Sequence, residues 1–439
     1  MPQDASADIF RIAPIQKASG TVRLPGSKSI SNRALLLAAL CREKTRLTGL
    51  LKAEDTERML QALSQLGLNI REEDSAVSIT QEADFPRQQA TIFVGNAGTV
   101  ARMLTAALAF AGGEYQLDGV KRMRERPIGD LVDALRSLGA RIDYLGTPGC
   151  LPLAIHRADL SGNRVSVKGN VSSQFLTALL MMSPVWACEH VRQTGRDEPF
   201  FIGIDGELIS RPYVEMTIKM MRHFGAVVEE GSSGYVVKPI AYRSPLAYAV
   251  EGDASAASYF LALGALAGGP IRVEGVGRNS LQGDVQFAEA LKIMGASVNV
   301  GDGFIEVLRS PDKKLSGLNY DCLSIPDAAM TFVPMALSTQ GSIELRGIAS
   351  WRVKETDRLQ AMVQEIRKFG ASVWFDSDWI RVERGPKLYP ARVATYSDHR
   401  MAMSFALAAC SGVSVEIENP ACTAKTFPNY FETLSSLIK

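Results

Sequence analysis

The sequence contains few residues that could hold a metal ion or build a disulfide framework. No cysteine belongs to a Cys-x-x-Cys pair, and none stands at metal-binding spacing from one of the four histidines. This pattern is typical of free thiols in a reducing compartment and argues against a zinc site. The rest of the sequence likewise contains no metal or cofactor fingerprint, and we expect neither kind of group. The six cysteines are Cys41, Cys150, Cys188, Cys322, Cys410 and Cys422.

An excess of charge of one sign is also absent. Lysine and arginine number 48 against 47 aspartates and glutamates, which leaves a formal net charge of +1. Proteins that bind nucleic acid or membrane surfaces in general need a basic excess to displace counterions. We therefore expect neither partner, and any affinity for anions must come from local groups of basic residues.

Long apolar runs are missing as well. The stretch LTALLMMSPVWAC at residues 176–188 is shorter than a membrane span and contains Pro184. The first residues are polar and acidic, without the apolar core of a signal peptide or the Arg/Ser-rich character of a transit peptide. These features predict a soluble, cytoplasmic protein.

What the 439 residues do contain is an internal repeat. Each copy opens with a Gly- or Pro-containing polar turn, continues into an apolar helix of about three turns, and closes with an amphipathic helix and a glycine. Two such domains with three copies each, divided near Val250, are expected from a chain of this length. The pattern predicts an α/β fold with helices inside as well as outside. The openings start at Pro25, Gly95, Gly169, Glu251, Ile325 and Tyr396, and the closing glycines are Gly67, Gly139, Gly225, Gly295 and Gly370.

The starts of the six opening helices are rich in Ser, Asn, Gly or Asp. Helix N-termini present unpaired N–H groups and a partial positive charge, so they attract anions. If the six starts converge on one cleft between the domains, they form an anion-binding site. One large irregular α/β chain with chance similarity is the alternative.

Four basic segments add side chains that suit phosphate or carboxylate. The first holds Lys28 and Arg33, which could instead be solvated capping residues. The second, residues 121–127, would project Arg122, Arg124 and Arg126 from one face if it is extended, or form a solvated basic edge. No Walker pattern is present.

The third basic segment, residues 351–359, would stack Lys354 and Arg358 on one helical face beside Glu355, as an acid/base site or as a surface ion-pair ladder. The fourth, Ser397 to Arg400, opens the sixth copy, and Asp327 holds the matching place in the fifth. Asp327 could be no more than an N-cap, and His399 could be a structural histidine. Lys425 is a single cation in a Pro-bounded loop.

Eight of these segments, in order, resemble the EPSP synthase family from about Ile12 to Leu437. They are LPGSKSISNRALLLAAL, GNAGT, RERPIGDLVDALR, SSQFLTALLM, IPDAAMT, RVKETDRL, DHRMAM and CTAKTFP. The resemblance is to the bacterial form that glyphosate inhibits. It implies the two-domain enolpyruvyl transferase fold, an inside-out α/β barrel with three βαβαββ repeats per domain. Residues 21–250 would form one domain and 251–439 plus 1–20 the other, with the hinge near 20–21 and 250–251.

The resemblance implies a transferase that joins shikimate 3-phosphate and phosphoenolpyruvate, releases phosphate through a tetrahedral intermediate, and works as a monomer in aromatic amino-acid biosynthesis. Asp327, Glu355 and Lys28 would be the acid/base residues. Shikimate 3-phosphate would contact Lys28, Ser29, Arg33, Ser172, Ser173, Gln174, Ser210, Tyr213, Asp327, Ser350 and Lys354. Phosphoenolpyruvate would contact Lys28, Asn96, Gly98, Arg126, Gln174, Arg358, His399, Arg400 and Lys425.

The chain departs from the family pattern at Ser350 and Ser397, which replace asparagines, and at Met103, where close relatives carry proline. We expect a changed phosphate contact at Ser350 and a mildly altered glyphosate sensitivity from Met103. Two alternatives remain. The related transferase that acts on UDP-N-acetylglucosamine needs a reactive loop cysteine, and a non-catalytic anion-binding protein would not need Asp327 and Glu355 among its cations.

Overall fold

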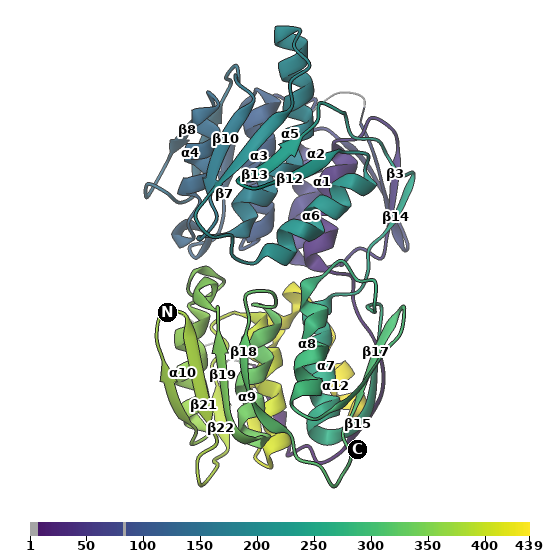
Figure 1. Ribbon diagram of the computed structural model, residues 1–439, viewed down its shortest axis with the longest axis vertical. Helices are drawn as coiled ribbons and strands as arrows, with labels where there is room; N and C mark the ends of the chain where they lie inside the picture. Colours follow the sequence, from purple (N-terminus) through teal and green to yellow (C-terminus); the bar gives the residue numbers. More distant parts are fainter. Residues whose placement is uncertain (1–7, 82–84) are drawn as a thin grey trace, which may run out of the picture. The chain divides into compact units, whose positions relative to one another are not determined.

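The computed structural model describes residues 8–81 and 85–439 and divides into two compact units. The N-terminal unit is Gly26–Glu251, and the C-terminal unit combines residues up to Pro25 with Gly252–Lys439 (Figure 1). The chain thus passes from one unit to the other between Pro25 and Gly26 and again between Glu251 and Gly252. We expected these passages near residues 20–21 and 250–251.

The second and third copies of the repeat are complete βαβαββ units. Their sheet orders, β6-β7-β9-β8 and β10-β11-β13-β12, each combine one parallel and two antiparallel pairs. The second copy consists of β6 (Gln89–Phe93), α3 (Gly98–Ala111), β7 (Glu114–Asp118), η1 (Met123–Glu125), α4 (Gly129–Ser137), β8 (Arg141–Tyr144) and β9 (Leu153–His156). The third consists of β10 (Arg164–Lys168), α5 (Ser173–Thr194), β11 (Phe200–Asp205), α6 (Arg211–His223), β12 (Val228–Gly231) and β13 (Gly234–Val237).

The first and fourth copies have exchanged their leading strands. β2 (Ala18–Arg23) directly precedes the first opening helix but pairs in parallel with β15 of the C-terminal unit, and β14 (Ala247–Ala249) pairs with β3 of the N-terminal unit. The first copy continues with α1 (Lys28–Ala39), β3 (Thr45–Thr48), α2 (Glu54–Gln65), β4 (Asn69–Glu73) and β5 (Ala76–Thr80). The fourth continues with α7 (Ala254–Ala267), β15 (Gly268–Glu274), η2 (Gly283–Gln286), α8 (Phe287–Ile293), β16 (Ser297–Val300) and β17 (Phe304–Leu308).

The fifth copy is complete, with the sheet order β18-β19-β21-β20. The sheet of the sixth has three strands, because β1 (Ile9–Ile12) pairs with β23 and β23 pairs with β22. The fifth consists of β18 (Ser316–Asp321), η3 (Ala328–Thr331), α9 (Phe332–Met335), η4 (Ala336–Ser338), β19 (Gln340–Arg346), η5 (Ala349–Val353), α10 (Arg358–Lys368), β20 (Ser372–Phe375) and β21 (Trp379–Glu383). The sixth consists of β22 (Ala391–Val393), α11 (His399–Phe405), η6 (Ala406–Ser411), β23 (Val415–Glu418), η7 (Pro420–Lys425) and α12 (Tyr430–Leu437).

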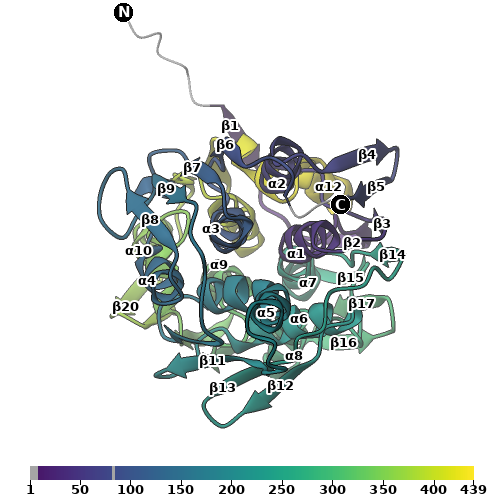
Figure 2. The same ribbon diagram turned by 90° about the horizontal axis from the view of Figure 1, so that it is seen from above.

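The opening helices form the core of each unit, as their apolar composition predicts. Every residue of α7 is buried, and so are most residues of α1 and α3. Figure 2 shows α1, α3 and α5 in the middle of the N-terminal unit, with its strands on the outside. The sheets are separate, open sheets.

The closing glycines behave as the sequence predicts. Their φ angles lie between 85° at Gly225 and 103° at Gly295, in the left-handed region that favours glycine after a helix. Two features of the opening helices differ from the prediction. The fifth and sixth are broken into short 3₁₀ and α segments, and α5 runs for 22 residues, through Pro184, instead of three turns.

No helix within residues 8–81 and 85–439 has both the length and the apolar character that crossing a bilayer requires.

Candidate active site

A buried arginine organises the candidate site of the C-terminal unit. Arg358 begins α10, is 1% exposed, and binds three carboxylates at once. Its Nε donates to Asp398 Oδ2 at 2.7 Å, its Nη1 to Asp327 Oδ1 at 3.0 Å, and its Nη2 to Glu355 Oε2 at 2.9 Å. The guanidinium therefore fixes three acidic side chains from three separate segments in one place.

Asp327 stands in the N-cap position of η3, but its side chain makes no capping hydrogen bond. It pairs instead with Arg358 and Arg400, both at 3.0 Å, and with Lys354 at 3.5 Å. Burial by itself would raise the pKa of Asp327, but the charges of Arg400, Lys354 and Arg358 hold it well below its usual range. The N-cap interpretation is wrong, and Asp327 is an ionised carboxylate surrounded by cations.

Glu355 and Lys425 extend the same cluster. Lys425 Nζ lies 3.4 Å from Glu355 Oε1, and both side chains are only 6% exposed. Lys425 comes from η7, in the Pro-bounded loop of the sixth copy. Lys425, which the sequence showed alone in its loop, is thus the second cation beside Glu355, after Arg358.

The sixth helix start contributes Asp398, His399 and Arg400 to this cluster. Asp398 caps α11 by accepting from the backbone N–H of Arg400 and also binds Arg358. Arg400 Nη1 donates to the hydroxyl of Tyr259 at 3.3 Å, and His399 is fully buried with Nδ1 3.6 Å from Asp398.

The local structure of residues 349–358 differs from the predicted helix. Residues 349–353 form η5, and α10 begins only at Arg358 after Asp357 has capped it. Lys354 therefore lies between two elements instead of one turn before Arg358 on a helical face. Both cations still contact Asp327, so the proximity was predicted for the wrong geometric reason.

In the N-terminal unit, the first helix start gathers Lys28, Ser29 and Arg33. The Ser27 side chain caps α1, and Lys28 Nζ lies 3.6 Å from Asp55 Oδ2, with the lysine side chain 11% exposed. Lys28 is therefore a nearly buried cation at a helix N-terminus, not a solvated capping residue.

Arg33 lies one turn further along α1 and is 3% exposed. Its guanidinium donates to Thr217 at 2.8 Å, to the Ser29 carbonyl at 3.0 Å and to Thr177 at 3.3 Å, all of them neutral acceptors. Burial lowers the pKa of Arg33 to about 10, and no described carboxylate pairs with it. The positive charge of Arg33 ties α1 to α5 and α6 without a compensating negative charge.

The third helix start carries the predicted Ser172, Ser173 and Gln174. Ser172 caps α5 by accepting from the backbone N–H of Gln174 at 3.3 Å. Ser210 precedes α6 with a positive φ of 53°, and the Tyr213 carbonyl accepts from Arg33 at 3.5 Å. Arg33 thus connects the first helix start with the segment that carries Ser210 and Tyr213.

The second helix start places Asn96 and Gly98 against Arg126. Arg126 Nη1 donates to the Asn96 carbonyl at 3.1 Å and to its side-chain oxygen at 3.2 Å. A Cβ at Gly98 would lie 2.4 Å from Arg126 Nη2, closer than van der Waals contact allows. Glycine is therefore required for this approach of the guanidinium to the helix start.

Residues 121–127 are not extended, because they contain the 3₁₀ helix η1, so the condition under which the three arginines would share one face is not met. Arg122 pairs with Glu125 at 3.1 Å and Arg124 with Asp118 at 2.5 Å. Arg126 is the arginine of this segment that hydrogen-bonds the second helix start.

Ser350, which belongs to η5, has a buried hydroxyl for which no protein partner is present among the described residues.

Three residues of these clusters had no assigned role in the sequence. Asp398 could have been found, because it matches Asp327 in position within the repeat. No sequence feature marks Asp55 or Tyr259 as a site residue. Asp55 lies in the first turn of α2, and Tyr259 lies in the apolar helix α7.

The cysteines do not provide a nucleophile. Burial raises the pKa of the Cys422 thiol to about 12 and the pKa of the Cys41 thiol likewise to about 12. Both are therefore protonated at neutral pH, as a packed thiol should be. The reactive-cysteine alternative is not supported. In the part of the chain that the structure describes, no group of His, Cys, Asp and Glu is arranged to hold a metal ion.

Comparison with known proteins identifies the family. Residues 12–434 match the family of EPSP synthase (3-phosphoshikimate 1-carboxyvinyltransferase). The chain is 52% identical over 437 residues to a 3-phosphoshikimate 1-carboxyvinyltransferase of Paraburkholderia phytofirmans, covering 98% of this chain and 99% of that one. The corresponding protein of Laribacter hongkongensis shows the same identity and coverage. The structure of EPSP synthase from Acinetobacter baumannii superimposes with a TM-score of 0.78 at 24% identity, over 98% of both chains, which supports the fold alone. The chain therefore belongs to the EPSP synthase family.

Proposed function

We propose that Asp327, with the cations around it, is the base in the reaction that this chain catalyses as a 3-phosphoshikimate 1-carboxyvinyltransferase. That reaction is the transfer of the enolpyruvyl group of phosphoenolpyruvate to the 5-hydroxyl of shikimate 3-phosphate. The observation that carries this proposal is the arrangement around Asp327. An ionised carboxylate beside Arg358, Arg400 and Lys354 suits a base that works among the negative charges of two anionic substrates.

We propose contacts to shikimate 3-phosphate in each unit, considered separately. The buried charge of Arg33, which neutral oxygens alone surround, supports an anion-binding role for the first helix start. The other proposed contacts are Lys28, Ser29, Ser172, Ser173, Gln174, Ser210, Tyr213, Asp327, Ser350 and Lys354. The buried Ser350 hydroxyl supports a direct or water-mediated contact there.

Phosphoenolpyruvate carries a phosphate and a carboxylate, and we assign both to arginines and lysines. Arg126 lies at the second helix start beside Asn96 and Gly98. Arg358 has five N–H groups, of which four already bind carboxylate oxygens, so at most one remains for substrate. We therefore give Arg358 mainly the role of positioning Asp327 and Glu355. The remaining proposed contacts are Lys28, Gln174, His399, Arg400 and Lys425.

The proton transfers follow from the two carboxylates. Asp327 accepts the 5-hydroxyl proton while the oxygen bonds to C2 of phosphoenolpyruvate, and Glu355, with Lys28, delivers a proton to the methylene carbon. Glu355, deprotonated by the first step, then takes one proton from the methyl group of the tetrahedral intermediate as the C–O bond to phosphate breaks. The proton held by Asp327 leaves with the phosphate.

The low pKa of Asp327 requires an explanation if it is to act as a base. Its three cationic partners stabilise the ionised form in the free enzyme. A bound phosphate or carboxylate would attract the same cations and so weaken their hold on Asp327. We infer that substrate binding raises the proton affinity of Asp327 at the moment when the hydroxyl must be deprotonated.

We further propose that the protein works in the cytoplasm as a monomer and that glyphosate inhibits it. The two passages of the chain, at Pro25–Gly26 and Glu251–Gly252, are the proposed hinge.

The test measures inorganic phosphate released from phosphoenolpyruvate with shikimate 3-phosphate, and with UDP-N-acetylglucosamine as the parallel acceptor. Release with the shikimate ester, lost in Asp327→Ala and Lys28→Ala, is the expected outcome. Release with the nucleotide sugar only, or with neither acceptor, would overturn the proposal.

A further inference from the structure

The outer face of the sheet of the fifth copy, β18-β19-β21-β20 (called the fifth sheet below), carries two of the four tryptophans. Trp186 and Trp351 are buried, but Trp374 on β20 and Trp379 on β21 both lie on the solvent face, where Trp374 is 48% exposed. The solvent face of an antiparallel sheet is usually polar, so two indoles here need an explanation.

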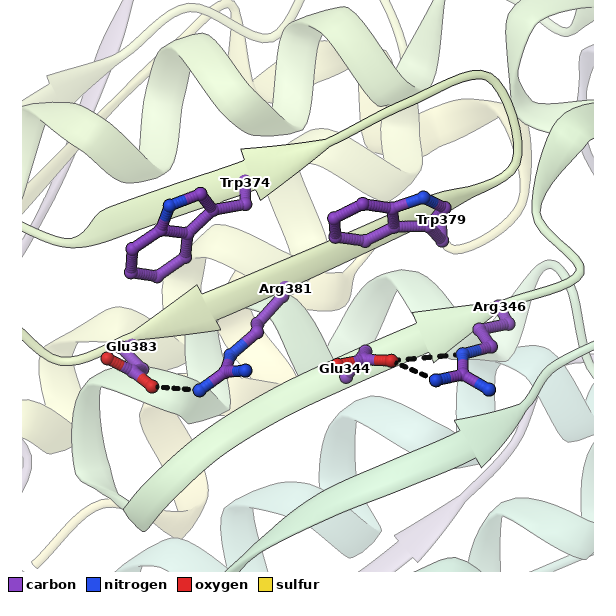
Figure 3. A pocket seen from close by; sticks show the side chains of 6 residues that line it. All are labelled: Glu344, Arg346, Trp374, Trp379, Arg381 and Glu383. Atoms are coloured by element: carbon purple, nitrogen blue, oxygen red, sulfur yellow. Dashed lines mark hydrogen bonds and ion pairs between the residues drawn. The ribbon is translucent and has the colours of Figure 1, made fainter.

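The two indoles border a hollow of about 650 Å³, within the range of small-molecule sites. Figure 3 shows the indoles in one row and four charged side chains in a second row beside them. Strand pairing fixes this arrangement, because Arg381 lies opposite Trp374 on one side and opposite Glu344 on the other, while Arg346 lies opposite Trp379. The sixth lining residue is Glu383.

The charged row consists of two ion pairs, each between residues two apart on one strand. Arg346 pairs with Glu344 and Arg381 with Glu383, both at 2.5 Å. The four charges sum to zero, which makes the hollow unsuited to a multiply charged anion such as either substrate. Exposed pairs of this kind contribute about 0–1 kcal/mol, so a ligand can open them at little cost.

Corresponding faces of other repeats provide a comparison. Arg272 covers Phe304 on the fourth sheet at 3.5 Å, and Arg164 covers Phe201 on the third at 4.4 Å. Each of these contacts covers an aromatic ring with a guanidinium. On the fifth sheet Arg381 lies 5.7 Å from the ring of Trp374, which stays about half exposed. An outward aromatic residue beside an arginine is thus common in this protein, whereas the paired indoles with two carboxylates distinguish the fifth sheet.

We propose that this hollow binds a small zwitterion that carries a flat apolar ring, the chemistry of an aromatic amino acid. The ring lies against the indoles. The carboxylate of the ligand takes the place of Glu383 on Arg381 or of Glu344 on Arg346, and its ammonium group binds the carboxylate so released. One carbon separates the two charges of an α-amino acid, so it can exchange partners with one ion pair and leave the net charge of the site unchanged.

The test is a titration with L-phenylalanine, followed by the fluorescence of the tryptophans. We expect saturable quenching in the full-length protein. 3-Phenylpropionate, which lacks the ammonium group, and phenethylamine, which lacks the carboxylate, should each bind about tenfold to 100-fold more weakly, since each loses one charge-assisted contact. Trp374→Ala and Arg381→Gln should weaken phenylalanine binding to a similar degree, and both variants should keep the wild-type rate of phosphate release.

Trp186→Phe is the matched control, because it removes a buried indole outside the hollow and should leave the affinity unchanged. Equal affinity for all three ligands, no saturable response, or an unchanged response in Trp374→Ala would overturn the proposal. So would a saturable response to glucose that exceeds the response to phenylalanine. Sedimentation of wild type and Trp374→Ala provides a last check, since a dimer that this substitution dissociates would make the face an interface between copies.

Discussion

The two units use cations in different ways at their helix starts. In the N-terminal unit, Arg33 and Arg126 donate mainly to hydroxyl, amide and carbonyl oxygens. In the C-terminal unit, Arg358, Arg400 and Lys425 each pair with a carboxylate. Arg33 therefore carries a positive charge that no described carboxylate balances, whereas Lys28 beside Asp55 and the cations of the C-terminal cluster are paired with carboxylates.

This difference begins at the N-cap positions. The opening helices of the C-terminal unit start at Asp253, Asp327 and Asp398, and those of the N-terminal unit at Ser27, Ala97 and Ser172. A serine N-cap satisfies backbone donors without adding charge, whereas an aspartate also adds a negative charge. The opening helices of the C-terminal unit thus carry an acidic residue where those of the N-terminal unit carry a neutral one.

The largest expected effect is that of Asp327→Asn. The amide keeps the shape of the side chain but cannot accept the hydroxyl proton, so kcat should fall by about 10²–10⁴-fold. Steady-state phosphate release measures this, with KM for both substrates as the second readout. Asp302→Asn, an exposed position in the same unit, is the matched control and should retain wild-type kcat. A kcat within twofold of wild type in Asp327→Asn would remove the acid/base role from Asp327.

Lys28→Met should affect both binding and chemistry. The methionine retains much of the apolar stem and removes the charge beside Asp55, which then lies buried without its lysine. Loss of one charge-assisted contact to each substrate should raise KM for both by about tenfold to 100-fold, and kcat should fall as well. Lys52→Met removes an exposed lysine of the same unit and should leave both constants unchanged. Unaltered KM values in Lys28→Met would contradict an anion-binding role for the first helix start.

The repeats could be read from the sequence, and the resemblance implied that residues 1–20 join the C-terminal domain, but the strand pairing of the exchange could not be predicted. The apolar opening helices and the closing glycines are local signals, and the structure confirms them. The pairing of β2 with β15 and of β14 with β3 depends instead on which of two similar sheets each strand joins. Nothing local distinguishes the sheets, because every copy offers an equivalent edge strand.

Arg358 illustrates a second limit of the sequence. Its identity as a site residue was expected from family resemblance, but its bonds to Asp327, Glu355 and Asp398 join three segments whose proximity only the folded chain determines. The predicted helical stacking with Lys354 failed because the chain turns after η5. Periodicity predicts which residues are neighbours on one helix, but it does not show where a turn interrupts that helix.

Gly98→Ala tests how closely Arg126 must approach the second helix start. The new Cβ would lie 2.4 Å from Nη2, so the guanidinium must move away from Gly98. We expect KM for phosphoenolpyruvate to rise by about tenfold, the cost of one weakened charge-assisted contact, with a smaller change in KM for shikimate 3-phosphate. Gly303→Ala is the matched control, because a Cβ there meets nothing within 4 Å and the backbone is not left-handed. Equal effects of the two substitutions would mean that Arg126 does not contribute to phosphoenolpyruvate binding.

The smallest expected effect is on the pH dependence of the unfolding free energy, which should differ between a variant of the C-terminal unit and a variant of the N-terminal unit. The pKa of Asp327 is lower in the folded protein than the value of about 3.9 in an unfolded chain, so its ionised form stabilises the fold at higher pH. That stabilisation is complete above about pH 4 and is lost as the pH falls through the folded pKa. The difference in unfolding free energy between wild type and Asp327→Asn, from urea titrations, should therefore be constant near neutrality and shrink in acid. Arg33 differs, because its lowered pKa of about 10 makes its contribution to the unfolding free energy depend on pH only in alkali. The difference between wild type and Arg33→Gln should stay flat through the acid range, and an acid-dependent difference there would contradict the assignment of carboxylate pairing to the C-terminal unit.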